Sequence, residues 1–288
     1  MIYKTLSGKE PAAEILKQIK NQVKGMDAAP RLGIIVVGEH EPTEIYINRK
    51  KTVASEVGVE TEIYRLPSNI KQDELIMLIE ELNKNSKING FIIQTPLPPQ
   101  IDPKAIFEKI SPFKDVDGFH PSNMGKILLN IFDNKMFSPA TPSGILKLLQ
   151  YYEVPIAGSE VVVIGRSNIV GKPISIMLLH NDATVTICHS QTKNLTEHTK
   201  RADILVVAAG IPGLINSAAV KEGAYVIDVG TTRIKDNEGK MRLVGDVDFK
   251  DVINKAHCSP VPGGVGQLTV AMLIANTVKA ALRKRDQP

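Results

Sequence analysis

The chain lacks most of the side chains that build disulfides and metal centres. Its only cysteines, Cys188 and Cys258, stand far apart and form no CxxC pair, so neither a disulfide framework nor a cysteine-bound zinc site is expected. The six histidines form no HExxH or other close ligand pair, and we expect no metal. So few cysteines favour the reducing cytoplasm as the compartment.

Long apolar runs and an excess of one charge are lacking too. The longest apolar runs, such as 34–37, have the length of a strand, and the chain starts without the apolar core of a signal peptide, so no membrane partner is expected. The 35 basic and 31 acidic side chains are interspersed, which gives a net charge of +4 and no basic stripe for a nucleic acid. A length of 288 residues favours two domains.

A glycine turn stands in the middle of the chain. The apolar run 161–164 leads into Gly165, Arg166 and Ser167 and then into a helix, which is typical of a βα unit that binds a nucleotide. Ser167 replaces the second glycine of the dinucleotide fingerprint, and Arg166 adds a guanidinium where a phosphate would approach the helix start. A P-loop is discounted because the spacing of the glycines is one residue too long and Pro173 replaces the hydroxyl residue that would hold magnesium.

The end of the next expected strand, 183–188, indicates which dinucleotide binds. This strand is followed by His189 and Ser190, whereas an NAD enzyme usually has an acidic residue there, which binds the ribose hydroxyls and repels a 2′-phosphate. Arg166 together with Ser190 can accept such a phosphate. The sequence therefore favours NADP as the cofactor.

Apolar periodicity predicts two α/β domains with parallel sheets. In the first domain we expect helices over 8–23, 43–57 and 72–83 and strands over 32–37, 60–66 and 90–94. In the second, Rossmann-like domain we expect a hinge over 138–144, helices over 145–152 and 173–180, and strands over 160–164, 183–188, 203–208 and 224–229. The final helix, 269–283, is expected to return to the first domain. The domains should thus span 1–138 with 269–288, and 139–268, with a cleft between them.

Four polar residues of the first domain are candidates for chemistry. Tyr46 and Lys50 stand four apart on one expected helix, so their side chains are neighbours, and a desolvated lysine beside a phenol can act as a general acid or base. Gln94 and Asp117 follow later strands of the same sheet, where open parallel sheets bind ligands, and an amide with a carboxylate suits a flat amino-pyrimidinone ring. The alternatives are a solvated basic face over 49–51, a proline-stiffened strand exit at Gln94 and a turn residue at Asp117.

Seven motifs occur in one order along nearly the whole chain. They are Tyr46-xxx-Lys50, Gln94-Thr95-Pro96-Leu97-Pro98, Asp115-Val116-Asp117-Gly118-Phe119, Pro139-Ala140-Thr141-Pro142, Gly165-Arg166-Ser167-Asn168-Ile169-Val170-Gly171, Cys188-His189-Ser190 and Pro260-Val261-Pro262-Gly263-Gly264-Val265-Gly266. Together they resemble the bifunctional methylenetetrahydrofolate dehydrogenase/methenyltetrahydrofolate cyclohydrolase family.

The resemblance implies an NADP-dependent oxidation of 5,10-methylenetetrahydrofolate to the methenyl form, and its hydrolysis to 10-formyltetrahydrofolate, which supplies one-carbon units. It implies that Lys50 is the catalytic lysine, that Tyr46 stacks near the pterin, and that Gln94 hydrogen-bonds Lys50. Asp117 would hold the pterin ring. The positions that match cofactor binding are Gly165, Arg166, Ser167, Ser190 and Thr231, and those that match a substrate-side loop are Pro262, Gly263, Gly264, Val265 and Gly266. A homodimer that pairs through the cofactor domains is implied as well.

The chain departs from the family pattern in three places. Ala140 stands where the family often has cysteine, so a cysteine nucleophile is not implied there. Gln267-Leu268 replaces a common Pro-Met, and Thr231-Thr232 stands where Ile-Asn is frequent. The first pair places a polar group near the expected substrate-side loop, which bears on affinity more than on the reaction.

Two other functions stay open from the residues alone. One is a different two-domain NADP-dependent dehydrogenase of a small polar acid, such as an amino acid or a shikimate-like acid. Its substrate carboxylate would need clustered Lys or Arg side chains, which Gln94 and Asp117 do not supply. The other is a cofactor-sensing module without chemistry, which would not need Tyr46 and Lys50 together.

Overall fold

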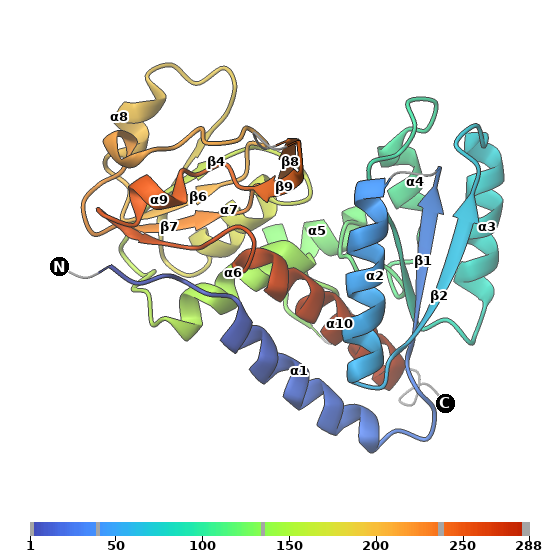
Figure 1. Cartoon of the computed structure of the whole chain (residues 1–288). Coiled ribbons are helices and arrows are strands. Elements are labelled where there is room, and N and C mark those ends of the chain that lie inside the picture. The colour runs from blue at the N-terminus through green and yellow to red at the C-terminus, as the bar shows by residue number, and fades with distance from the viewer. Residues whose placement is uncertain (1–2, 39–40, 134–135, 236–238, 284–288) are drawn as a thin grey trace. The chain divides into compact units, whose positions relative to one another are not determined.

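The computed structural model describes residues 3–38, 41–133, 136–235 and 239–283, and contacts within the chain divide it into two units. The first-sheet unit comprises Glu14–Ala140 and Val270–Pro288. The second-sheet unit comprises Met1–Ala13 and Thr141–Thr269. Both contain a parallel sheet flanked by helices, as the alternating sequence pattern predicts (Figure 1).

The first sheet has three parallel strands in the order β2-β1-β3. The strands are β1 (Arg31–Val37), β2 (Glu60–Leu66) and β3 (Gly90–Ile93). The accompanying helices are α1 (Lys9–Lys24), α2 (Glu41–Glu56), α3 (Gln72–Lys84), α4 (Pro103–Lys109) and α5 (Pro121–Leu128). The first three helices match the expected ones to within two residues.

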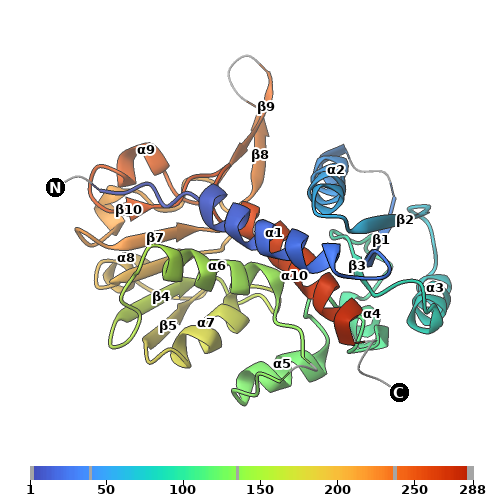
Figure 2. The same cartoon turned by 90° about the horizontal axis from the view of Figure 1, so that it is seen from below.

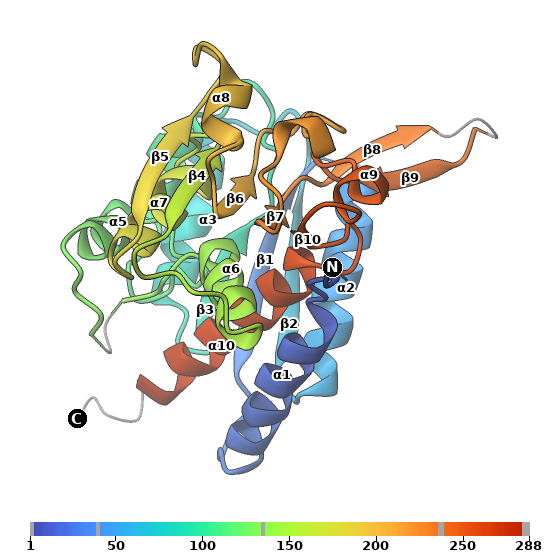
Figure 3. The same cartoon turned by 90° about the vertical axis from the view of Figure 1, so that its left-hand side faces the viewer.

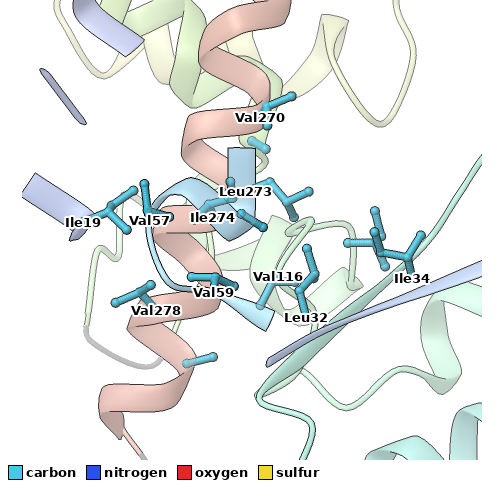
Figure 4. Close-up of a cluster of buried hydrophobic side chains, with 14 of the residues drawn as sticks. Ile19, Leu32, Ile34, Val57, Val59, Val116, Val270, Leu273, Ile274 and Val278 are labelled. Atoms are coloured by element: carbon cyan, nitrogen blue, oxygen red, sulfur yellow. The ribbon is translucent and has the colours of Figure 1, made fainter. Parts of the chain in front are cut away.

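The central strand β1 is buried on both faces, which explains its continuous apolar run. Alternate side chains point to opposite faces of a strand, so Leu32, Ile34 and Val36 belong to one core cluster, and Ile35 and Val37 to the other. The first cluster includes residues of α1, α2 and the last helix, α10 (Val265–Arg283), and Figure 4 shows its side chains. The second cluster includes residues of α3 and α4.

The second sheet has five parallel strands in the order β10-β7-β6-β4-β5. They are β4 (Glu160–Ile164), β5 (Thr184–Cys188), β6 (Ile204–Val207), β7 (Tyr225–Asp228) and β10 (His257–Cys258). The helices are α6 (Ala140–Tyr151), α7 (Gly171–Leu179), α8 (Leu195–Thr199), the 3-10 turn η1 (Ser217–Ala219) and α9 (Phe249–Val252). An antiparallel ribbon of β8 (Thr232–Lys235) and β9 (Met241–Val244) extends from this unit (Figures 2 and 3).

The first residues of the chain attach to the second sheet. Thr5 forms a parallel bridge with Cys258, and the Leu6 N–H donates to the Cys258 carbonyl at 2.8 Å. The Gly8 N–H donates to the Gly263 carbonyl, also at 2.8 Å. Residues 1–13 therefore belong to the second-sheet unit, whereas the sequence pattern placed them in the first domain. Backbone pairing of this kind leaves no periodic signal in a short segment.

Two helices begin earlier than the sequence predicts. α6 starts at Ala140, inside the expected hinge 138–144, because Pro142 fits the first turn of a helix, where no N–H partner is needed. α10 starts at Val265, so Val265 and Gly266 of the expected loop are its first residues. The helices α4 and α5 were not expected, although Asp102 and His120 cap them and a proline follows each cap.

In the described part of the chain, α10 is the one helix whose length and mean hydropathy would allow it to cross a membrane. Within the structure 61% of this stretch is buried. Val270, Leu273 and Ile274 lie in the core of the first-sheet unit, and that role accounts for the apolar composition.

Candidate active site

Lys50 and Gln94 meet at the carboxyl edge of the first sheet. Lys50 lies on α2, which follows β1, and Gln94 is the residue after β3. The Lys50 Nζ donates to the Gln94 Oε1 at 2.9 Å, and the Gln94 Nε2 donates to the Thr95 carbonyl at 2.9 Å. The second bond fixes the amide orientation, so that its oxygen faces the lysine. The structure thus brings together two residues that stand 44 positions apart in the sequence.

Asp117 acts on the same lysine through its charge. Burial lowers the pKa of Lys50, and the negative charge of Asp117 opposes that shift. Burial also raises the pKa of Asp117 to about 6, an effect that Lys50 opposes and Asp115 increases. Both side chains keep some solvent exposure. Each group therefore holds its charge less firmly than it would in water, as expected of groups that exchange protons or bind polar ligands.

The neighbouring carboxylate, Asp115, is fully hydrogen-bonded within the protein. It is buried and accepts hydrogen bonds from three backbone N–H groups, those of Gly118 at 3.1 Å, Phe119 at 3.1 Å and His120 at 2.8 Å. The Asn123 Nδ2 donates a fourth bond at 2.8 Å. Asp117 accepts no hydrogen bond from the residues that the structure describes. Asp115 thus shapes the turn, and Asp117 is left available for a ligand.

Two further residues, Gly118 and Asn276, stabilise this turn, and neither was predicted from the sequence. Gly118 has a φ of +77°, and a Cβ there would lie 2.6 Å from the Pro139 nitrogen, so only glycine fits. The Asn276 Nδ2, from α10, donates to the carbonyls of Val116 at 2.8 Å and Ser138 at 3.0 Å. A buried asparagine on the apolar face of a helix was the available signal, because a buried amide must find partners.

Tyr46 precedes Lys50 by one turn of α2, as predicted. Its hydroxyl is buried and has no hydrogen-bond partner among the described residues. A buried polar group without a partner is unusual and costly in a folded protein. The hydroxyl therefore has an unused hydrogen-bonding capacity one helical turn from Lys50, where its role in the site is predicted.

The glycine turn of the second sheet fits a dinucleotide. Gly165, directly after β4, has a φ of +122°, and a Cβ there would collide with the Ala208 carbonyl. A Cβ on Gly171 would collide with the Gly165 carbonyl, so the turn lies directly against the first residue of α7. Neither position tolerates a side chain, and the backbone stays open to a phosphate at the helix start.

The remaining cofactor candidates lie at the same edge of the second sheet. Ile164 pairs with Cys188, so Arg166 and Ser190 occupy equivalent positions beyond two neighbouring parallel strands. Both are exposed, as is Thr231 beyond β7. The Ser167 Oγ accepts from the N–H groups of Val170 at 3.2 Å and Gly171 at 3.3 Å, so this hydroxyl shapes the turn and keeps only its hydrogen for a ligand.

The expected substrate-side loop belongs to the second-sheet unit, whereas Lys50, Gln94 and Asp117 belong to the first. Gly263 has a φ of +117° and accepts the bond from Gly8 described above. A Cβ on Gly8 would collide with the Gly264 carbonyl. The loop is thus held by the first residues of the chain, and a longer side chain at Gly8 would displace it.

Two other concave places in the first-sheet unit carry no comparable chemistry. Two open depressions of about 650 and 590 Å³ lie at the opposite edge of the sheet, and Arg31 lines both. That guanidinium already pairs with Glu60 at 2.5 Å and Glu62 at 3.6 Å. Among the described residues there is no group of three or more His, Cys, Asp or Glu side chains that could hold a metal ion.

Comparison with known proteins gives a consistent result along the chain. Residues 6–117 match the family model of the tetrahydrofolate dehydrogenase/cyclohydrolase catalytic domain, and residues 139–285 match that of its NAD(P)-binding domain. A bifunctional FolD protein of Sulfurihydrogenibium is 48% identical over 285 residues, covering 97% of this chain and 98% of the relative.

Two solved structures show the same fold over the whole chain. The bifunctional FolD enzyme of Campylobacter jejuni is 42% identical, with a TM-score of 0.92 and coverage of 98% of this chain and 99% of the other. The methylenetetrahydrofolate dehydrogenase-cyclohydrolase of Trypanosoma brucei, complexed with NADP and an inhibitor, is 35% identical, with a TM-score of 0.94 and complete coverage of both chains.

Proposed function

This chain belongs to the tetrahydrofolate dehydrogenase/cyclohydrolase family, and on that premise we propose that Lys50, Gln94 and Asp117 serve both reactions of one bound folate. Membership confirms the dehydrogenase and cyclohydrolase activities predicted from the sequence. It also removes the alternatives of a small-acid dehydrogenase and of a sensing module. The observation that carries the residue roles is the Lys50–Gln94 hydrogen bond, together with the charge of Asp117, which acts on Lys50 and accepts no hydrogen bond from the described residues.

In the dehydrogenase step, 5,10-methylenetetrahydrofolate loses a hydride from its methylene carbon and becomes the methenyl cation. When bound, NADP supplies the acceptor for that hydride. The step moves no proton, so the protein contributes mainly position and orientation. Asp117 would accept hydrogen bonds from the N–H groups of the pterin ring, and Tyr46 would pack against the folate with its hydroxyl in reach of a polar atom.

The cyclohydrolase step requires proton transfer. Water attacks the methenyl carbon and loses one proton, which leaves a hydroxyl on that carbon. The hydroxyl loses the second proton as the formyl C=O forms, while N5 gains a proton as its bond to the carbon breaks. The product is 10-formyltetrahydrofolate, and one proton is released overall. The Lys50 Nζ can take the proton of the attacking water when the amine is neutral, a form that burial favours by lowering its pKa. Gln94 accepts a hydrogen bond from Lys50 and so fixes the position of the amine.

The cofactor residues favour NADP. Arg166 and Ser190 stand beyond neighbouring strands with no acidic residue between them and the strand ends. A guanidinium and a hydroxyl there would bind the 2′-phosphate, while the turn at Gly165 would admit the pyrophosphate. Thr231 would contact the cofactor from the loop after β7. We also propose that the enzyme is a cytoplasmic homodimer whose subunits pair through their second sheets.

One spectroscopic assay tests the proposal. The protein is mixed with methylenetetrahydrofolate and NADP, and the ultraviolet absorbance of the methenyl product is followed as it appears and decays. We expect both phases in the parent enzyme, and NADP should be used more efficiently than NAD. Absence of the decay, or equal efficiency with the two cofactors, would contradict the proposal.

A further inference from the structure

Two buried carboxylates lie at the carboxyl edge of the second sheet, and neither has a part in the proposed reactions. Asp228 is the last residue of β7, and Asp246 follows β9. Both side chains are almost completely inaccessible to solvent. Buried carboxylates are expensive unless they accept hydrogen bonds, so their partners indicate why they are there.

Asp246 holds the loop that follows β6. Its Oδ2 accepts from the N–H groups of Ala209 and Gly210, both at 2.7 Å. The residue before them, Ala208, presents the carbonyl that lies against the Cα of Gly165. One carboxylate oxygen therefore fixes the strand end next to the glycine turn of the candidate dinucleotide site.

Asp228 holds Asp246 and the loop that follows β7. Its Oδ1 accepts from the N–H groups of Gly230 and Asp246, both at 2.9 Å, and its Oδ2 accepts from the Val247 N–H at 3.0 Å. The two carboxylates also occupy the space that side chains would need at Gly230 and Gly245. This explains why glycine stands at both places. The bonds to the two carboxylates also couple the segment before Thr231 to the loop after β6.

We infer that Asp246, supported by Asp228, is a positioning residue for the NADP site, which it maintains by fixing the loops beyond β6 and β7 around the glycine turn. The inference rests on the proposed function, because an open parallel sheet binds its dinucleotide at this edge. The carboxylate is fully buried and its Oδ2 bonds the backbone of Ala209 and Gly210, so its effect passes through that backbone.

Asp246→Ala tests the inference. The substitution leaves the N–H groups of Ala209 and Gly210 without their acceptor, so the loop should shift. We expect the Kd for NADP, measured by calorimetry, to rise at least about tenfold, which corresponds to a loss of about 1.4 kcal/mol. Hydrolysis of methenyltetrahydrofolate, assayed without NADP, should stay within about twofold of the parent rate because it needs no cofactor. Asp246→Asn keeps an oxygen for both N–H groups and should restore most of the NADP affinity.

Asp203→Ala is the matched control. Asp203 also accepts a backbone bond, from the Glu160 N–H at 2.9 Å, but at the amino edge of the same sheet. Its loss should leave the Kd for NADP within about twofold of the parent value. Parental affinity in Asp246→Ala would overturn the inference, and so would an equal loss in both variants.

Hydrogen exchange in the parent enzyme tests the same point without any substitution. NADP should slow amide exchange in peptides that cover 208–213 and 229–231, and should leave the amino edge of the sheet unchanged. Unchanged exchange in both peptides would overturn the inference even if Asp246→Ala fails to fold. Failure of the proposed function looks different, because the parent enzyme itself would then not reduce NADP with methylenetetrahydrofolate.

Discussion

Each of the two sheets has a pair of aspartates near its carboxyl edge, and the two pairs are used differently. In the first-sheet unit, Asp115 accepts four hydrogen bonds and shapes a turn, while Asp117 accepts none from the described residues. In the second-sheet unit, both Asp228 and Asp246 accept backbone N–H groups. One pair therefore leaves Asp117 without a bond from the described residues. In the other pair both carboxylates hold loops, although the Asp246 Oδ1 has no partner among the described residues.

The comparison shows that burial and a raised pKa alone do not identify a ligand-binding carboxylate. Burial raises the pKa of both Asp117 and Asp228 to about 6. Their hydrogen bonds separate them, because the protein satisfies Asp228 and leaves Asp117 for another partner. Lys50 adds the second distinction, since a basic side chain lies beside Asp117, whereas the titratable neighbours of Asp228 are the carboxylate of Asp246 and the thiol of Cys258.

The largest effect is expected when the amine of Lys50, the proposed proton-transferring group beside Asp117, is removed. Lys50→Met should reduce cyclohydrolase activity about a hundred- to ten-thousandfold, the usual contribution of general acid–base catalysis, while part of the dehydrogenase activity survives. Methenyltetrahydrofolate should then accumulate in the coupled ultraviolet assay. Lys51→Met, which changes the exposed neighbour, should behave as the parent enzyme. Hydrolysis at the parental rate by Lys50→Met would remove this lysine from the mechanism.

A second variant tests Arg166, the candidate 2′-phosphate ligand of the second-sheet unit. Arg166→Ala should weaken NADP binding about ten- to a hundredfold, because a charge-assisted hydrogen bond contributes roughly 1.5–3 kcal/mol, and should hardly change NAD binding. Lys172→Ala is a suitable control, since this exposed lysine already bonds the Asn168 Oδ1 at 2.7 Å. The Kd of each variant is measured by titration with NADP and with NAD. Equal losses of affinity for the two cofactors would count against a 2′-phosphate site.

A pH series separates Asp117 from the structural carboxylates. The pKa of Asp117 is raised to about 6, so its carboxylate gains a proton as the pH falls through 6 and loses its capacity to accept from the pterin. One unit below a pKa only about one carboxylate in eleven stays ionised, and KM for the folate should rise about tenfold between pH 7 and pH 5. Asp117→Asn should have a high KM in both reactions and no such rise. A parental KM in this variant would make Asp117 a turn residue.

The smallest effect should appear in stability. Asp115→Asn keeps the shape of the side chain but gives up a charged acceptor of four bonds, so the melting temperature should fall by several degrees. Asp117→Asn should leave the melting temperature unchanged or raise it slightly, because it removes a partly desolvated charge. Differential scanning calorimetry of both variants without ligand measures this. A larger fall in the melting temperature for Asp117→Asn than for Asp115→Asn would contradict the structural role of Asp115 and the ligand-binding role of Asp117.

Much of the fold follows from periodicity. Buried parallel strands read as apolar β-branched runs, α1 and α3 have clear helical faces, and Pro42 and Gly58 bound α2, so these elements were predicted to within about two residues. The motifs around Lys50, Gln94 and Asp117 were expected to lie together because they follow strands of one sheet. The structure brings the Lys50 amine to the Gln94 amide oxygen and within reach of the charge of Asp117. The early starts of α6 and α10 were missed because Pro142 and the glycines before Val265 indicate a loop when taken alone.

The supporting residues could not be predicted, because their partners are distant in sequence. Asn276 bonds two carbonyls that stand at least 138 positions away, and nothing near it in the sequence points to them. Asp246 reads as a turn residue between Gly245 and Val247, and only the structure shows that it accepts from Ala209 and Gly210. The pairing of Thr5 with Cys258 is a third contact between segments that are distant in the sequence.

The helix α10 has a consequence for how such a protein can be divided. It begins in the second-sheet unit, yet Val270, Leu273, Ile274 and Val278 fill the core of the first-sheet unit beside β1 (Figure 4). A gene fragment that ends at Asp117 would encode the candidate catalytic residues without the helix that completes their core. We expect such a fragment to aggregate when it is expressed alone. Recombination at a single point between the two family domains would therefore yield unstable proteins, and a successful exchange must carry the last helix along with residues 14–140.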